Sequence, residues 1–330
     1  MTQHKYIGRQ FTLGIAKEAT RGTGVAPSYW LEWETLSIDD EITSAKDEGV
    51  IGVIEKGVGQ ETTFVEAKGS VEGRITDLGF GLLLKCIMGT DTVGAVETGV
   101  KDHVFTVLQS AQHPTLTFTV VDTNSNTGSG YAYALGSVDS LEMTFEIDKY
   151  AKYKAGFTAN KGASLAATTG YTLENAFRPQ DGTIKIASNL SGLSGASAIN
   201  ITKATVSLKQ NVKPDKALGN IAAVDRLNEE FVCSGSLELK YYDRTFIDTY
   251  LLADAYAAFS FVFANSAVTI GAASNPTLTV SIAKCKLQSV ARKIDPKGII
   301  TQMVKFDAFY SLGDTEMLSI TLRNTVTSAY

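Results

Sequence analysis

The sequence predicts a mainly β fold with short helices, a β-rich α+β class, built as two copies of one domain. Three observations predict it. Apolar and polar residues alternate in many short segments, which is the pattern of half-buried strands. One strand-to-helix pattern occurs twice. The composition, with 29 glycines and many threonines, serines and valines, favours strands joined by tight turns.

The repeated pattern spans residues 69–77 and 235–243. In each copy apolar side chains alternate with charged ones, so one face of a strand is buried and the other is solvated. Each copy then reaches an aspartate, Asp77 or Asp243, followed by an apolar run of helical length. An aspartate there predicts a helix N-cap, because its carboxylate accepts bonds from otherwise unpaired amides. Each copy therefore predicts a strand that runs into a short buried helix.

Two further matches keep the same order along the chain. Pro114 aligns with Pro276 inside a shared Pro-Thr-Leu-Thr run, and Phe157 aligns with Phe306. The offset is 166 residues for the strand-to-helix pattern (235 − 69) and 162 for the prolines (276 − 114). A deletion in one loop would produce this difference, since loops absorb changes of length.

We therefore expect two domains, residues 1–165 and 166–330, each with one flanking helix. A small, polar linker is expected over residues 160–169. Domains of this size bury enough surface for a proper core. The alternative is an ordinary α+β protein in which similar strand-to-helix patterns arose by convergence.

Composition and charge exclude several classes of protein. No stretch reaches eighteen apolar residues and no apolar signal core follows the N-terminus, so we expect no membrane span and synthesis in the cytoplasm. The net charge of −5 argues against a protein that grips nucleic acid, but suits a wall past which DNA slides. The three cysteines lack CxxC spacing and are expected to be buried thiols.

The residues that usually carry enzyme chemistry are sparse. The three histidines, His4, His103 and His113, lack the neighbouring nucleophile or metal-ligand spacing that catalysis requires. The glycine-rich segment 14–27 lacks the lysine and the following helix of a phosphate-binding loop. We therefore predict no enzyme activity, no catalytic residue, no cofactor and no metal site.

The segment 41–63 is a candidate contact arm. It is longer than a standard hairpin connection, carries glycines at 49, 52, 57 and 59, and contains an apolar run. Exposed apolar residues usually mark contacts, although a plain flexible loop is the alternative. Residues 210–230 form a similarly long and charged segment in the second copy. The candidate arm residues are Glu48, Val50, Ile51, Val53, Ile54, Glu55 and Lys56.

A second candidate surface lies on the strand predicted over residues 141–147. Apolar residues alternate there with Glu142 and Glu146, and Asp148 follows. Paired carboxylates can perform acid and base chemistry, but residues on the polar side of a strand are mostly only solvated. We treat these three residues as a candidate acidic face.

Three segments together resemble the tail tube proteins, or major tail proteins, of long-tailed bacteriophages that carry two tube domains in tandem. They are the loop over residues 14–27 before Trp30, the alternating segment 138–150, and the hairpin 294–300. The resemblance implies β-sandwich-like domains, each with one flanking helix, whose sheets join around a ring into a closed inner barrel. It covers most of the chain as a pattern and layout.

The resemblance also implies partners and a location. Six such domains close a ring, so a tandem chain would form a trimeric ring with pseudo-sixfold symmetry, and hexameric rings are the alternative. The long loop would reach the neighbouring ring, and the acidic face would line the lumen. Other implied partners are the tape measure, tail tip and tail terminator proteins, with DNA passing through the lumen without specific binding.

The function expected from the sequence is that of a structural subunit of the virion tail, which self-assembles into stacked rings for genome ejection. The main alternative is a two-domain β-sandwich adhesin or carbohydrate-binding protein, which would need a secretion signal and exposed aromatic platforms. An enzyme with an unrecognised site is the second alternative and would need a pocket with perturbed titratable groups.

Overall fold

The protein is mostly β-structure, as expected. A computed structural model describes residues 7–122 and 129–330. It contains one α-helix, α1 (Phe80–Met88), one π-helix, η4 (Phe246–Leu252), and short 3-10 turns η1 (Gly8–Gln10), η2 (Pro179–Asp181) and η3 (Ser191–Leu193). The strands are β1 (Phe11–Lys17), β2 (Tyr29–Leu31), β3 (Thr35–Lys46), β4 (Gln60–Arg74), β5 (Thr92–Glu97), β6 (Val100–Thr106), β7 (Leu116–Asp122), β8 (Ser129–Glu146), β9 (Lys152–Ala159), β10 (Ala163–Ala166), β11 (Gly182–Ala187), β12 (Ala198–Ile199), β13 (Ile201–Lys209), β14 (Lys213–Asp215), β15 (Asp225–Leu227), β16 (Val232–Lys240), β17 (Ala257–Ala264), β18 (Thr277–Lys293), β19 (Thr301–Ala308) and β20 (Leu318–Asn324).

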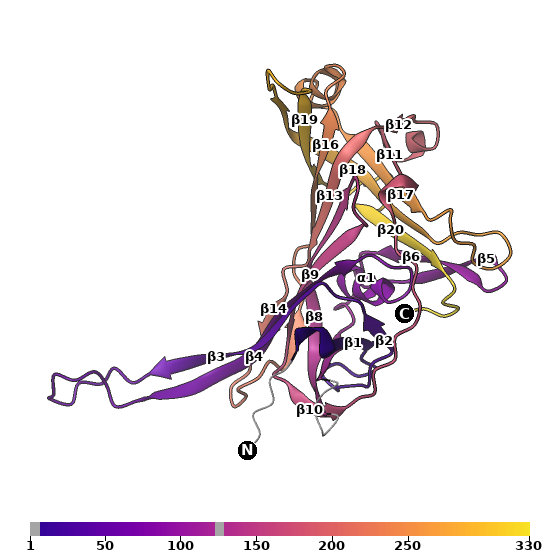
Figure 1. Cartoon of the computed structure of the whole chain (residues 1–330). Helices are drawn as coiled ribbons and strands as arrows, with labels where there is room; N and C mark the ends of the chain where they lie inside the picture. Colours follow the sequence, from indigo (N-terminus) through magenta and orange to yellow (C-terminus); the bar gives the residue numbers. More distant parts are fainter. Residues whose placement is uncertain (1–6, 123–128) are drawn as a thin grey trace.

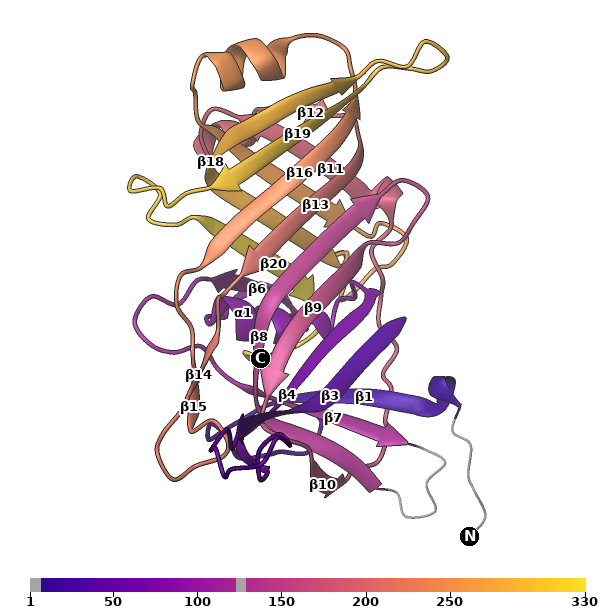
Figure 2. The same ribbon diagram turned by 90° about the vertical axis from the view of Figure 1, so that its left-hand side faces the viewer.

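One long sheet dominates the molecule. Eight antiparallel strands follow one another in the order β3-β4-β9-β8-β13-β16-β19-β18. The first four come from the first half of the chain and the last four from the second half. Figure 2 shows these strands lying obliquely, side by side, and following one another from the bottom of the molecule to the top. The two halves join where β8 pairs with β13, with Leu141 opposite Leu208.

A second layer closes each half over its core. In the first half, β1 pairs with β2 and β7, and the beginning of β8 pairs with β7 and β10. In the second half, β11 pairs with β12 and β17, and the beginning of β18 pairs with β17 and β20. The long strands β8 and β18 thus take part in both layers. Helix α1 packs behind the long sheet, against β8, β6 and β1 (Figure 1).

The pairing schemes of the two halves coincide strand for strand. We call two strands counterparts when they occupy the same place in the two schemes. The counterparts are β1 and β11, β2 and β12, β3 and β13, β4 and β16, β7 and β17, β8 and β18, β9 and β19, and β10 and β20. The division of the chain into domains at residue 165 stays a prediction, and that boundary falls inside β10, which pairs with β8.

Two β-bulges recur at the same places. The β8–β9 register shifts between Val138 and Ser140, and the β18–β19 register shifts between Leu287 and Ser289. A second shift interrupts β7–β8 and recurs in β17–β18. A bulge bends its strand and increases the local twist, so these shifts mark where β8 and β18 turn from one layer to the other.

The repeated glycine has a packing reason. Gly69 faces Phe157 across β4 and β9, and Gly235 faces Phe306 across β16 and β19. A Cβ at either glycine would lie 2.4 Å from the Cζ atom of the facing ring. The phenylalanine therefore requires the glycine, which explains why both members of the pair recur and agrees with the predicted match of the two phenylalanines.

The other predicted match is wrong. Pro114 precedes β7 and Pro276 precedes β18, and these two strands are not counterparts. The halves differ instead by the β5–β6 hairpin, which follows α1 in the first half only. Strand β6 pairs with β20 of the second half, placing Phe105 opposite Ile320. The offset between true counterparts falls from 166 at the glycines (235 − 69) to 149 at the phenylalanines (306 − 157), and this insertion lies between those two pairs.

Both predicted N-caps are also wrong. Helix α1 begins at Phe80, and its N-cap is Gly79, which offers no side chain. The Asp77 carboxylate instead accepts bonds from the backbone and side-chain amides of Asn175, while the Gly79 N–H donates to Glu174. Asp243 accepts a bond from the backbone N–H of the residue that caps η4, so it precedes the cap. A residue from a distant segment can satisfy a helix end as well as a local one.

The core is continuous across the halves. Phe118 stacks on Phe157 with ring centroids 3.9 Å apart, and Phe145 of β8 stacks on Phe263 of β17 at 4.1 Å. The three cysteines are buried free thiols, as predicted. Burial raises the pKa of the Cys86 thiol to about 12, so this thiol is protonated and unreactive at neutral pH.

Candidate assembly surfaces

The long sheet has two open edges within the described residues. Strand β3 pairs only with β4, and the end of β18, beyond its pairing with β20, pairs only with β19. An open edge presents unpaired N–H and C=O groups that can bind another strand. The two edges carry opposite charges, with Asp39, Asp40 and Glu41 on β3 and Arg292 and Lys293 on β18.

The exposed face of the long sheet has mixed charge. Glu142 lies opposite Lys154 of β9, and Glu146 binds Lys149 and Lys203 at 3.0 and 3.8 Å. Glu142 and Glu146 share this face, but Asp148 lies beyond β8 in a turn with φ of 65°, so its expected place on the strand is wrong. Exposed ion pairs of this kind contribute little to stability and leave little net attraction for a polyanion.

The predicted arm is a long hairpin rather than a loop. Strands β3 and β4 extend beyond the sheet to Lys46 and Gln60, so residues 41–46 and 60–63 of the segment expected to be irregular are paired strand, and residues 47–59 connect them. Figure 1 shows this hairpin standing clear of the body. All seven candidate arm residues lie between the ends of the two strands, within a segment closed by the Asp47 N–H donating to the Gly59 carbonyl at 2.9 Å.

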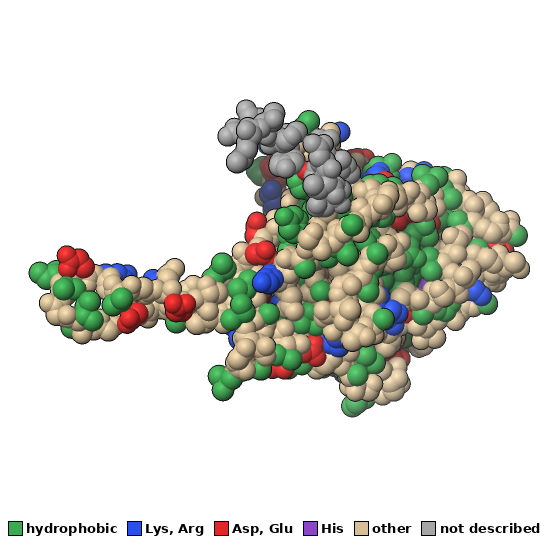
Figure 3. Space-filling view, turned by 90° about the horizontal axis from the view of Figure 1, so that it is seen from below, with side chains coloured by type: hydrophobic (Ala, Val, Ile, Leu, Met, Phe, Trp, Pro, Cys, Tyr) green, Lys and Arg blue, Asp and Glu red, His purple; other side chains and the backbone are tan. Residues whose placement is uncertain are grey.

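The tip of the arm is apolar and uncovered. Val50 is 94% exposed and Ile54 is fully exposed, and Ile51, Val53 and Val58 are also exposed. Figure 3 shows hydrophobic side chains grouped at the far end of the projecting hairpin. Such a group usually marks a contact surface in soluble proteins. The term arm is used below for residues 47–59 with the strand ends that carry them.

The long segment of the second half behaves differently. Residues 211–230, here called the clasp, contain the β14–β15 hairpin and lie against the first half of the chain. The Val65 N–H donates to the Ile221 carbonyl at 2.6 Å, and Ala223 is buried together with Phe64 and Leu135. The clasp therefore covers apolar surface that the first half would otherwise expose.

One buried arginine holds the clasp. Arg226 is 1% exposed, donates to the Ala159 carbonyl at 2.5 Å and lies 3.5 Å from the carboxylate of Glu66. Burial lowers the pKa of the guanidinium, and the charge of Glu66 opposes that shift. Arg21 donates to the Arg226 carbonyl at 2.7 Å and also binds Asp225. Sequence reasoning missed these residues, because nothing local distinguishes Arg226 from a solvated charge.

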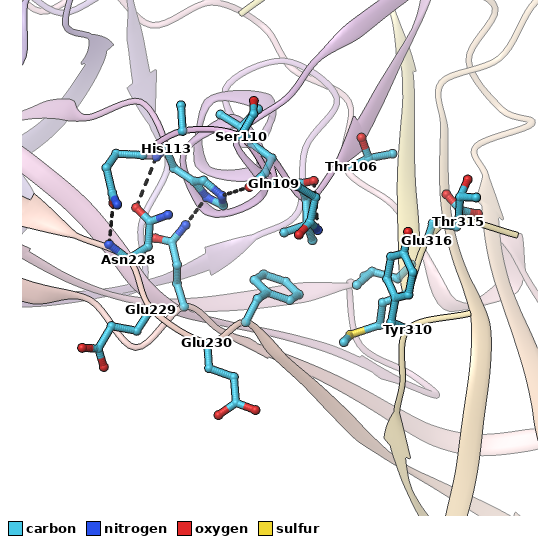
Figure 4. A pocket seen from close by; sticks show the side chains of 18 of the residues that line it. Thr106, Gln109, Ser110, His113, Asn228, Glu229, Glu230, Tyr310, Thr315 and Glu316 are labelled. Carbon is cyan, nitrogen blue, oxygen red and sulfur yellow. Dashed lines mark hydrogen bonds between the residues drawn. The ribbon is translucent and has the colours of Figure 1, made fainter. Parts of the chain in front are cut away.

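A cleft of about 860 Å³ lies between the halves. Its walls are residues 106–113, the segment Asn228–Phe231, and residues 310 and 314–318 (Figure 4). His113 contacts the carbonyl of Leu108 and the side chain of Gln210, and burial lowers the pKa of its imidazole. No group of His, Cys, Asp and Glu side chains suited to holding a metal occurs within residues 7–122 and 129–330.

Matched halves, open edges of opposite charge and a projecting apolar hairpin define a structural β protein that associates with copies of itself. The chain matches the phage tail tube protein family over residues 8–308, and it belongs to that family. It is therefore a structural component of the virion tail. A search of curated proteins found no match. In the described part of the chain, no helix is long and apolar enough to span a membrane.

Proposed function

We propose that three chains form a closed ring and that these rings stack into the tube through which the phage genome is ejected. The observation that carries this proposal is the β8–β13 junction, which joins the two halves into one continuous sheet. If the halves are two copies of one tube domain, this junction is a template for the contact between neighbouring chains. The end of β18 would then pair with β3 of the next chain.

The template gives a register for that contact. Met143 of β8 faces Val206 of β13, and the counterparts of these residues are Arg292 of β18 and Ile38 of β3. By the same rule Val290 faces Asp40. The opposite charges of the two edges favour this pairing, because acidic side chains of β3 come diagonally opposite Arg292 and Lys293.

The same template favours three chains over six. Each chain supplies eight strands of the continuous sheet and two equivalent halves, so three chains supply six halves, the number implied by the resemblance to tube proteins. Pairing around the ring also leaves no open edge, which removes the hazard of uncontrolled association. The mixed-charge face would then line the lumen of the tube, and the arm would be a contact surface.

Electron microscopy and native mass spectrometry of the concentrated protein test the proposal. We expect stacked rings with three chains in each. Rings of six chains would contradict the stoichiometry, and a protein that stays monomeric at high concentration and with tail initiators present would contradict the function. Images of the assembled state also report whether the ring has pseudo-sixfold symmetry.

A further inference from the structure

The arm and the clasp share one pairing register. In the arm Lys46 pairs with Gln60, and in the clasp Pro214 pairs with Arg226. The first member of each pair, Lys46 or Pro214, lies eight residues after the residue that faces the repeated glycine (46 − 38 and 214 − 206). The second member, Gln60 or Arg226, lies nine residues before that glycine (69 − 60 and 235 − 226). The clasp is therefore the counterpart of the arm, with a tip two residues shorter.

The two hairpins differ in what lies beneath them. The clasp extends from β13 and β16 and lies on the half whose β8 pairs with β13. The arm extends from β3 and β4, and β3 has no second partner strand within the described residues. The arm thus projects without a half of the described chain beneath it.

The second half carries the corresponding surface uncovered. The clasp contacts Phe64, Val65 and Asn160. Residues of β4 and β16 that occupy the same place differ by 166 in number, so the counterparts of Phe64 and Val65 are Glu230 and Phe231. Residues of β9 and β19 differ by 149, so the counterpart of Asn160, which follows β9, is Phe309. Glu230 and Phe231 line the cleft. Phe309 is 42% exposed.

The segment after β19 adds to this surface. Tyr310 lines the cleft and is 45% exposed, and Leu312 is 86% exposed. Figure 4 shows Tyr310 and Glu230 among the side chains that line the cleft. An exposed aromatic and apolar surface beside a cleft is the expected form of a site for an apolar segment.

We propose that, in the assembled ring, the arm of one chain lies across this surface of the neighbouring chain whose β18 pairs with its β3. The inference rests on the proposed function. The occupant is a second copy of this chain, because the clasp already shows the same hairpin in the equivalent place. The exposed apolar residues of the arm cover Phe309, Tyr310 and Leu312, and each chain is locked to its lateral neighbour.

Engineered disulfides test this contact. The Val65 N–H donates a hydrogen bond to the Ile221 carbonyl. With the offset of 166 between β4 and β16, the counterpart of Val65 is Phe231 and the counterpart of Ile221 is Glu55. We expect the variant Glu55→Cys with Phe231→Cys to cross-link in assembled tubes under mild oxidation, since hydrogen-bonded backbones lie within disulfide range. The ladder in a denaturing gel then ends at three chains. The three native thiols are buried and do not interfere.

Matched variants separate the possible results. Val65→Cys with Ile221→Cys should give a disulfide within one chain and no ladder, and each single substitution should give no ladder. Glu55→Cys with Glu230→Cys repeats the test at an exposed position, in case loss of Phe231 impairs folding. Tubes without any cross-link, or a ladder that continues beyond three chains, would overturn the proposal. Failure to form rings at all would instead overturn the proposed function.

Discussion

At the scale of single residues, Arg226 shows how a charge can organise a hairpin. Its guanidinium is buried between the first half and the clasp, where the Ala159 carbonyl and Glu66 replace the water it loses. A buried charge is costly unless it is paired, so its partners and its position depend on one another. The clasp has only short strands of its own and is held by these contacts.

We expect Arg226→Met to lower the free energy of unfolding by about 2 kcal/mol, because the buried Ala159 carbonyl loses its donor and Glu66 loses a cation. Glu66 keeps Lys68 at 3.3 Å, which limits the loss. Urea denaturation measures the effect, and trypsin should cut the variant faster at Lys216. Lys213→Met removes an exposed ion pair with Glu229 and is the matched control. Equal stabilities of the two variants would contradict this role.

The buried histidine His103 faces a carboxylate and a backbone carbonyl. Its Nδ1 lies 3.2 Å from both oxygens of Asp91, and its Nε2 lies 3.0 Å from the Val326 carbonyl. Burial opposes the charge, but the bonds to Asp91 and Val326 outweigh it and raise the pKa of His103 above 6.5. Folding therefore favours the protonated ring.

A raised pKa contributes stability that is complete below pH 6.5 and is lost as the pH rises through the folded pKa. We expect His103→Gln to be most destabilising below pH 6.5 and less so at alkaline pH, as followed by thermal unfolding. His113 has a lowered pKa, so it costs stability as the pH falls below 6.5. His113→Gln should consequently reduce the loss of stability as the pH falls below 6.5. A pH-independent effect of His103→Gln would refute the assignment.

At the scale of elements, the proposed contact between chains joins the open edges of β3 and β18. Their unpaired backbone groups would bind any strand, so selectivity must come from side chains. The acidic residues of β3 and the basic residues of β18 supply it. Like charges brought opposite one another suppress wrong pairings, such as β3 with another β3.

We expect Arg292→Glu with Lys293→Glu to weaken ring formation by about tenfold or more, because acidic residues would then face an acidic edge. Adding Asp39→Lys and Asp40→Lys should restore assembly. Sedimentation velocity measures both effects, and circular dichroism checks that the monomer stays folded. Lys297→Glu, in the turn after β18, changes charge away from the edge and should have little effect. Unchanged assembly of the first variant would exclude this edge.

At the scale of the whole molecule, we expect the two halves to unfold as one unit. They share the β8–β13 pairing, the β6–β20 pairing and a continuous core in which Phe145 stacks on Phe263. Contacts across a large apolar interface make the stability of each half depend on the other. The inserted β5–β6 hairpin strengthens this connection through Glu97, which accepts bonds from Ala272, Ala273 and Ser274.

We expect a single thermal transition in calorimetry. Phe145→Ala should lower the stability of the whole molecule by about 3–4 kcal/mol, the typical cost of removing a buried aromatic ring, without splitting the transition. Leu218→Ala, at a fully exposed position, is the control. Two separate transitions, with only one moved by the substitution, would show that the halves unfold independently.

Much of the architecture was predictable from local pattern. The alternation around Gly69 and Gly235 predicted half-buried strands, which β4 and β16 confirm. The apolar runs after Asp77 and Asp243 predicted buried helices, which holds for α1, but η4 buries only Phe246. The candidate arm was found because a segment too long for a standard hairpin connection carries several glycines and an apolar run. Its exposed position could be inferred from sequence, but its contact surface could not.

Other features could not be predicted from short segments of the sequence. Pro114 and Pro276 share a motif but precede strands in different places, because short motifs recur by chance more readily than pairing schemes do. The carboxylate near the start of α1 comes from Glu174 rather than Asp77. These outcomes depend on residues that are distant in sequence and close in space.

The sequence by itself determined that this chain is a β protein with a repeated strand pattern and an exposed apolar segment, because strand alternation and apolar runs depend on neighbouring residues. Only the tertiary structure decided which edges stay open, that β6 pairs with β20, and that one long hairpin is clasped while the other projects. The physical reason is that hydrogen bonding and burial are satisfied by whichever partner the complete fold brings near, and that partner can be any distance away in the chain.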